Sequence, residues 1–119
     1  MVGATGDNQR SRTMVAEDWQ TKDTDELIAA ILRLKSADEA ARFLRDLCTL
    51  GEIHDLAQRW AVVRLLDDGK HYAEISRETG ASTATITRIA SWLKHGEGGY
   101  RQALERLQKT KRTRTPTKP

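Results

Sequence analysis

Cysteine, proline and long apolar runs are scarce in this chain of 119 residues. Cys48 is the only cysteine, which excludes an internal disulfide, and one thiol with three scattered histidines forms no zinc-binding pattern. Both prolines, Pro116 and Pro119, lie at the end of the chain, so no proline interrupts a helix upstream. The longest apolar run, residues 27–32, is far shorter than the ~20 residues of a membrane-spanning helix, and the first residues do not resemble a signal peptide. We therefore expect a soluble, cytoplasmic protein without a metal, a cofactor or a membrane contact.

Positive charge is concentrated at the C-terminus. The net charge is +3, but residues 109–119 hold five Lys and Arg residues and no acid, which leaves −2 for residues 1–108. This composition is typical of a disordered tail that serves either as a solubilising extension or as a nonspecific attraction for nucleic acid. Residues 1–22 are polar, of mixed charge and aperiodic, and predict a disordered N-terminal arm. The folded domain is therefore expected over residues 23–108.

Apolar residues between these two ends recur at helical spacing and rarely alternate as they do in strands. The first predicted helix begins at a cap formed by Thr24 or Asp25, the second covers about 37–48, the third ends at Gly69, and the last covers about 99–109. A capping-box spacing, with Ser or Thr three residues before Glu, precedes the second and third helices, at Ser36 with Glu39 and at Thr49 with Glu52. The sequence thus predicts an all-α protein.

Residues 71–94 have the pattern of a helix-turn-helix. A short helix over residues 72–79 is followed by Gly80, which supplies the backbone freedom that the turn needs, and by a second helix over about 83–94. In the first of these helices, Ala73 is small where the helix must approach its neighbour, and Ile75 is expected to point into the core.

The second helix of this motif has an apolar face and a slim polar face. Ile86, Leu93 and either Ile89 or Ala90 are expected to anchor it, and Ser82 or Thr83 to cap it. Residues 81–94 contain no acid, and small or hydroxylated side chains suit entry into a major groove about 12 Å wide. A corner used only for packing would not need the exposed residues of this face, which are Thr83, Ala84, Thr87, Arg88 and Ser91.

We therefore predict that the motif contacts DNA. The first helix is expected to supply phosphate contacts, from Tyr72, Ser76 and Arg77. The turn and the second helix are expected to supply the rest, with groove contacts from Thr83, Ala84 and Thr87, and further contacts from Ser82, Thr85, Arg88 and Lys94.

The string TGASTATITRIASWLK, with LCTLGEIHDLAQRWAVVRLLDDGK before it, resembles the Trp repressor superfamily, in particular its YerC/YecD-type members. Their hallmark is a segment like GASTATITR followed by a GxGGY-like stretch, here residues 96–100. The resemblance covers roughly residues 25–107. It implies an intertwined, all-helical homodimer whose helix-turn-helix units meet successive major grooves of double-stranded DNA, and a sequence-specific transcriptional regulator, expected to be a repressor.

The resemblance also implies a place for a ligand. In the Trp repressor the co-repressor tryptophan lies between two arginines, beside a threonine region of the partner chain, and the matching positions here are Thr49, Arg59 and Arg88. Ile89 replaces the glycine after the second arginine, and Trp92 replaces a serine three residues further on. Both add bulk, so we expect a vestigial pocket that does not bind tryptophan. Trp92 is expected either to fill this pocket or to lie in the core or the dimer interface.

One further departure concerns the reading of bases. The family's repressor uses an arginine early in the first helix of the motif to contact a base, and the corresponding residue here is Ala73. The operator sequence of the repressor therefore does not carry over to this chain.

Two other classes of function compete with DNA binding. An enzyme is not expected, because His54 and Asp55 are helical neighbours that point about 100° apart and no other nucleophile and base share a recognisable arrangement. The stronger alternative is a dimeric helical module that binds another protein and has lost specific DNA binding. The modest charge of residues 1–108 and the presence of Ala73 both favour this alternative slightly.

Overall fold

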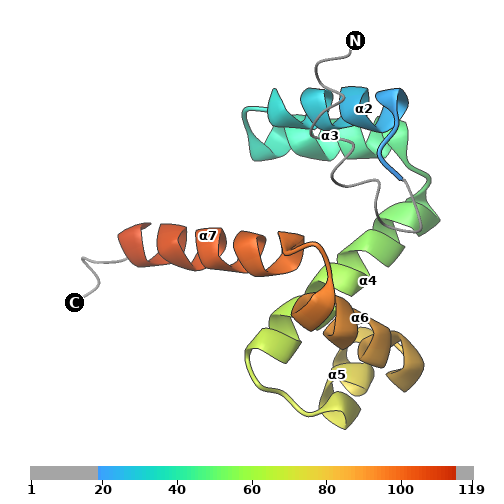
Figure 1. Cartoon of the computed structure of the whole chain (residues 1–119), viewed down its shortest axis with the longest axis vertical. Helices are drawn as coiled ribbons and strands as arrows, with labels where there is room; N and C mark the ends of the chain where they lie inside the picture. The colour runs from blue at the N-terminus through green and yellow to red at the C-terminus, as the bar shows by residue number, and fades with distance from the viewer. Residues whose placement is uncertain (1–18, 115–119) are drawn as a thin grey trace. The chain divides into compact units, whose positions relative to one another are not determined.

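A computed structural model describes residues 19–114 of the chain, and the side chains of residues 19–109. Six helices and no strand are found in this part, which confirms the all-α prediction (Figure 1). The chain divides into two units, residues 1–47 and 48–119. No helix among the described residues is long and apolar enough to cross a membrane.

The first unit contributes two helices of 11 residues each, α2 (Lys22–Leu32) and α3 (Ala37–Leu47). Helix α2 begins two residues before the predicted cap, because Thr21 is the N-cap and Thr24 is its partner one turn later. The Thr24 backbone N–H donates to the Thr21 hydroxyl at 3.2 Å, and the Thr21 N–H donates to the Thr24 hydroxyl at 2.7 Å. Thr24 is therefore the second half of a capping box rather than the cap itself.

The predicted caps of the next two helices are confirmed. Before α3, the Glu39 N–H donates to the Ser36 hydroxyl at 3.1 Å. Before α4 (Leu50–Asp67), the Glu52 N–H donates to the Thr49 hydroxyl at 3.1 Å, and the Glu52 carboxylate accepts the Thr49 N–H at 2.9 Å. These local bonds fix where both helices start, because they satisfy backbone donors that have no partner within the helix.

The second unit contains α4, α5 (Tyr72–Thr79), α6 (Thr83–His95) and α7 (Gly99–Arg114). Helices α4, α5 and α6 contact one another, and α7 contacts α6. The core of this unit consists of seven buried residues, namely Val62, Val63, Ile75, Ala81, Ile86, Ile89 and Leu104. Most of it thus lies between the C-terminal half of α4 and the helix-turn-helix. Figure 1 shows α5 and α6 beside this half of α4.

Two sequence predictions for this unit differ from the structure. Ala73 is exposed, so it mediates no close helix contact, and the approach of α5 to α4 depends on the fully buried Ile75 instead. Helix α7 continues to Arg114, although the sequence predicted disorder from Lys109 onward. Residues 109–114 contain neither proline nor glycine, and cations are favoured at the C-terminal end of a helix dipole. The rest of the predicted tail, and residues 1–18 of the predicted arm, lie outside the described residues.

Gly80 provides a test of the turn between α5 and α6. It has a φ of +80°, a left-handed conformation that a side chain disfavours, and a Cβ at this position would lie 3.7 Å from the Gln58 amide nitrogen. We expect Gly80→Ala to lower the free energy of unfolding by about 1 to 2 kcal/mol, measured by urea denaturation. Gly99→Ala is the control, because a Cβ at Gly99 meets nothing within 4 Å and no positive φ is required there. Equal midpoints for the two variants would contradict this account.

Candidate nucleic-acid interface

The turn between α5 and α6 is held by side chains as well as by its backbone. The Ser76 hydroxyl donates to the Ala81 carbonyl at 2.7 Å, which bridges the turn from one end to the other. The Thr79 hydroxyl donates to the Ile75 carbonyl at 2.8 Å and accepts the Ala81 N–H at 3.1 Å. Together with the left-handed Gly80, these bonds fix the angle at which α6 leaves α5.

Gln58 ties this turn to α4. Its side-chain amide donates to the Thr79 carbonyl at 3.0 Å across 21 positions of sequence. Both Gln58 and Thr79 position the candidate interface, and the sequence analysis missed both of them. A Gln on a helix surface gives no signal in the sequence, because its partner is a backbone carbonyl that only the folded chain brings near.

Helix α6 presents the two faces that the sequence predicts. Ile86 and Ile89 are fully buried and Leu93 is partly buried, whereas the predicted outward residues Thr83, Ala84, Thr87, Arg88 and Ser91 are all exposed. Ser82 caps the helix, because its hydroxyl accepts the Thr85 N–H at 3.1 Å. The start of α6, which is the end that a recognition helix directs into a groove, is therefore fixed and exposed.

The hydroxyl groups of this region have different roles. The Thr87 hydroxyl donates to the Thr83 carbonyl at 2.9 Å, and the Thr85 hydroxyl bonds with Ser82 and accepts from Arg88 at 3.4 Å. The donors of Ser76 and Thr87 are thus engaged within the chain, and a phosphate contact would require them to exchange these bonds. The side chains of Tyr72, Arg77, Thr83 and Lys94 make no hydrogen bond or ion pair within the described residues, so their donors are available to a ligand.

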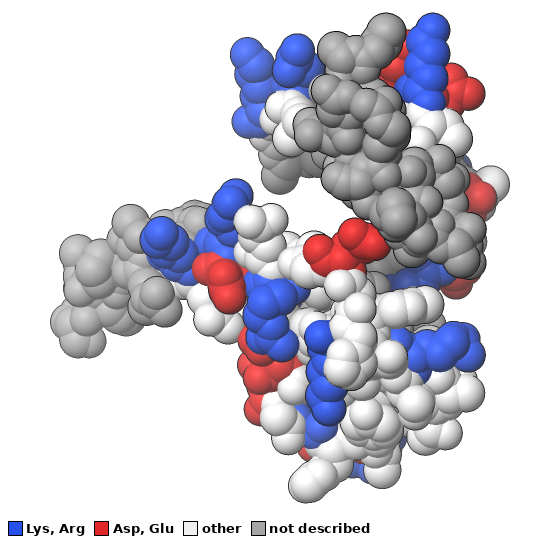
Figure 2. Space-filling model, viewed as in Figure 1, with Lys and Arg blue, Asp and Glu red and all other residues white. Residues whose placement is uncertain are grey.

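Charge on this part of the molecule suits an anionic partner only moderately. No acid lies in the first turn of α6, and Lys94 and His95 lie in its last turn. On the face drawn in Figure 2, the surface over α5 and α6 is mostly uncharged, with Lys and Arg side chains scattered across it. The drawn surface of α5 and α6 is therefore mostly uncharged with a few cations, and it is not a dense basic patch.

The predicted vestigial pocket is not assembled within one chain. Ile89 is buried in the core with 1% of its surface exposed, whereas Trp92 has 49% exposed and is not part of the core. Arg59 and Arg88 are exposed, on α4 and α6, and no hydrogen bond or stacking contact joins either of them to Trp92 among the described side chains. The Thr49 hydroxyl is the α4 cap. Ile89 therefore acts as an anchor of α6.

Arg59 instead lines a shallow hollow of about 270 Å³ on the first turns of α4. Two carboxylates, Glu52 and Asp55, share that hollow with Cys48 and Leu56. Two acids beside one arginine disfavour the binding of a carboxylate group in this hollow of the single chain.

Helix α7 is fixed to the end of α4. The Asp67 carboxylate accepts from the Arg101 guanidinium at 3.1 Å and from the Gln108 amide at 3.1 Å, and these two residues lie two turns apart on α7. Trp60 and Tyr100 add a tilted aromatic contact, with ring centroids 6.3 Å apart. The orientation of α7 beside the helix-turn-helix thus depends on a few contacts between residues 34 to 41 positions apart. No local sequence pattern predicts such contacts.

Comparison with known proteins agrees with this architecture. The family model for the Trp repressor protein matches residues 22–108, and the chain belongs to this family. YerC of Bacillus subtilis (strain 168), which is described as uncharacterized, is 48% identical over 97 residues that cover 82% of this chain and 93% of YerC. A Trp operon repressor homolog of Chlamydia trachomatis serovar L2 is 34% identical over 82 residues, covering 65% of this chain and 87% of that protein.

A solved structure shares the fold. The crystal structure of a TrpR-like protein from Eubacterium eligens ATCC 27750 superposes with a TM-score of 0.72 at 44% sequence identity. The match covers 75% of this chain and 92% of that one. The resemblance seen in the sequence, a Trp-repressor-like protein of the YerC type, is thereby confirmed, and so is the helical fold class.

Ser76 and Arg77 are neighbours with opposite expected roles, and this provides a second test. Ser76→Ala removes the bond across the turn and is expected to lower the free energy of unfolding by about 1 kcal/mol. Arg77→Ala removes an exposed cation and is expected to leave stability unchanged, while lowering the salt dependence of DNA binding by about one phosphate contact. Urea denaturation and binding titrations at several salt concentrations measure the two effects. A stable Ser76→Ala protein would show that the bond does not hold the turn.

Proposed function

We propose that this protein is a sequence-specific DNA-binding regulator of transcription, a repressor that places α6 in the major groove of double-stranded DNA. Membership of the Trp repressor family supports the class of regulator and argues against an enzyme. We expect a protein of this class to work in the cytoplasm, where it can reach the chromosome. The operator is left to experiment, because the exposed Ala73 stands where the family's repressor has a base-contacting arginine.

The observation that carries the proposal is the outward face of α6. Its first two turns present Thr83, Ala84 and Thr87 on an exposed helix that Ser82 caps and that a fixed turn orients. Small side chains of this kind allow close approach to base edges, and the neighbouring Arg88 and Lys94 supply cations for the backbone. Packing of α6 does not require this polar face, because the apolar face of the helix already contributes to the core.

We propose further that the protein acts as a homodimer. Helices α2 and α3 have no buried residue. Their apolar residues nevertheless recur at helical spacing, so each helix has an apolar face. Six large apolar residues of α2 and α3 are 36–72% exposed, namely Leu27, Ile28, Ile31, Leu32, Leu44 and Leu47. Exposed apolar surface on this scale is unfavourable in water, and a second copy of the chain would cover it while pairing two reading helices for a two-fold symmetric operator.

The same exposed side chains favour the alternative, a module that binds another protein through α2 and α3. The two functions differ in their response to salt. Each phosphate contact releases counterions, so DNA affinity falls steeply as salt rises, whereas an interface formed by apolar burial is much less sensitive.

Selection of genomic fragments tests the DNA-binding proposal. Purified full-length protein is expected to enrich a two-fold symmetric site, with or without added tryptophan. The double variant Thr87→Ala, Arg88→Ala is expected to lose roughly 2 to 4 kcal/mol of specific binding, because it removes one groove-facing side chain and one cation assigned to the DNA backbone. A truncated protein without residues 109–119 is the control and is expected to keep the same site preference. If no site is enriched by a folded dimer, the protein-interaction function gains support instead.

The homodimer has its own test. Sedimentation equilibrium of the 13.4 kDa chain is expected to give about twice this mass. Ile31→Glu places a charge in the exposed apolar surface of α2 and is expected to raise the dimer dissociation constant by roughly a hundredfold, at a cost of about 2 to 3 kcal/mol. Ala29→Glu introduces the same charge at an exposed position on another side of α2 and is expected to have little effect. A monomeric wild-type protein, or equal effects of the two variants, would overturn the proposed interface.

A further inference from the structure

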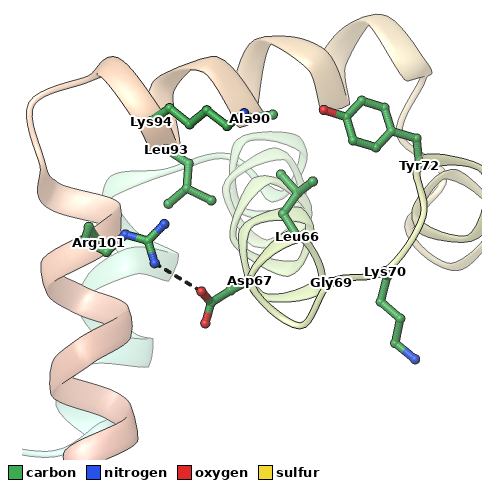
Figure 3. Close-up of a pocket in the computed structure, with 9 residues that line it drawn as sticks. All are labelled: Leu66, Asp67, Gly69, Lys70, Tyr72, Ala90, Leu93, Lys94 and Arg101. Atoms are coloured by element: carbon green, nitrogen blue, oxygen red, sulfur yellow. Dashed lines mark hydrogen bonds and ion pairs between the residues drawn. The ribbon is translucent and has the colours of Figure 1, made fainter.

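A cavity of about 350 Å³ lies where α4 ends and where α5, the second half of α6 and α7 come together. Its wall includes Leu66, Asp67, Tyr72, Ala90, Leu93 and Lys94 (Figure 3). This volume is at the lower end of the range that small-molecule sites occupy. All of these residues belong to the second unit, so the cavity is complete within residues 48–119.

The lining of the cavity is apolar at its centre and cationic at its edge. Leu66 and Leu93 are partly buried and pack against the hydrophobic core. Figure 3 shows both side chains pointing into the space between α4 and α6. Ala90 leaves room beside them because its side chain is a single methyl group. An apolar floor with this much room suits a small apolar or aromatic body rather than a bare ion.

Two polar groups are directed toward the same space. The Lys94 side chain runs along α6 toward Ala90, and the Tyr72 hydroxyl points inward from the start of α5 (Figure 3). Neither group makes a hydrogen bond or ion pair within the described residues, whereas Asp67 is already neutralised by its ion pair with Arg101. A ligand at this place therefore meets one uncompensated positive charge and one hydroxyl donor, a combination that recognises an anionic group.

This cavity is separate from the position where the family's co-repressor binds. Arg88 and Trp92 mark that position on α6, and Ala90 and Lys94 mark the cavity. With about 100° of rotation per residue, the midpoints of the two pairs lie about 160° apart around the helix. Lys94 shares a stripe of α6 with Thr83 and Thr87, at spacings of eleven and seven residues, so the cavity opens beside the face that we assign to DNA.

We propose that this cavity binds a small organic carboxylate with an apolar or aromatic body, and that its binding weakens the affinity for DNA. The binding part follows from the cavity alone, and the effect on DNA rests on the proposed function. Negative charge held at Lys94 removes a cation from the DNA-facing side and repels the phosphate backbone. Such a ligand acts as an inducer of the repressor.

Linkage makes this effect reciprocal. If the carboxylate lowers DNA affinity by a given factor, bound DNA must lower the affinity for the carboxylate by the same factor. A contact at one cation predicts a modest coupling of roughly three- to tenfold.

Binding is tested first without DNA, so that its failure is distinct from a failure of the proposed function. Benzoate is titrated into full-length isotope-labelled protein and followed by NMR, with benzyl alcohol as the neutral probe of similar shape and inorganic phosphate as the anion without an apolar body. We expect saturable shifts at residues around the cavity with benzoate, and at least roughly tenfold weaker binding of the other two probes. Equal binding of phosphate would reduce the cavity to a nonspecific anion contact and overturn the proposal, as would the absence of saturable shifts with benzoate.

Substitutions then locate the site. Ala90→Leu fills the cavity without changing any charge or any residue assigned to DNA contact, and it is expected to weaken benzoate binding by at least roughly tenfold while DNA binding persists. Ala103→Leu is the matched control, because Ala103 is also half-buried but lies on α7 outside the cavity. Lys94→Gln tests the charge, with Lys35→Gln, on the first unit, as its control. Unchanged benzoate binding in both Ala90→Leu and Lys94→Gln would refute the assignment of this cavity.

The regulatory part is tested last, on the DNA site that the fragment selection yields. Saturating benzoate is expected to lower the affinity of the wild-type protein for that site, and to have no effect on Ala90→Leu. If benzoate binds at the cavity and DNA affinity does not change, the site stands and its role as an inducer site is wrong.

Discussion

The burial of Ile75, Ile86 and Ile89 against Val62 and Val63 is the interaction on which the rest of this structure depends. These five side chains are almost completely removed from water, and each β-branched residue has few rotamers to exchange, so α4, α5 and α6 pack in one arrangement. The polar face of α6 is exposed for the same reason, because anchoring one side of a helix determines which side remains. A loss of packing at any of these positions would therefore alter the orientation of the polar face of α6 without changing a residue on that face.

Local chemistry made much of this fold predictable. The capping pairs Ser36 with Glu39 and Thr49 with Glu52, the left-handed Gly80 and the apolar spacing of α6 each act within four residues, and a sequence pattern records such short-range constraints directly. The outward face of α6 was also predictable, since helical geometry places every residue once its buried side is known. The predicted helix ends were wrong where the local pattern was compatible with more than one end residue. This was so at the N-terminus of α2 and at the C-terminus of α7.

The parts that sequence reasoning missed depend on distant contacts. Gln58 reaches the turn across 21 positions, and Asp67 binds α7 across 34 and 41. The sequence around a polar residue on a helix surface does not predict such a partner, because only the folded chain brings the two residues together. The same reasoning applies to Ser76, whose contact with DNA stays a prediction. A hydroxyl group beside a turn looks available in the sequence, and only its bond to the Ala81 carbonyl shows that its donor is engaged.

The division of the apolar residues between the two units bears on how the protein is stabilised. The second unit contains every buried residue of the described chain, whereas α2 and α3 contain none. Two helices of 11 residues are too short to persist on propensity alone, so their stability must come from packing of their apolar faces. In the proposed dimer this packing would be supplied between chains. Folding of α2 and α3 would then depend on protein concentration, and the spacing of the two reading helices would be set by the same association that completes the fold.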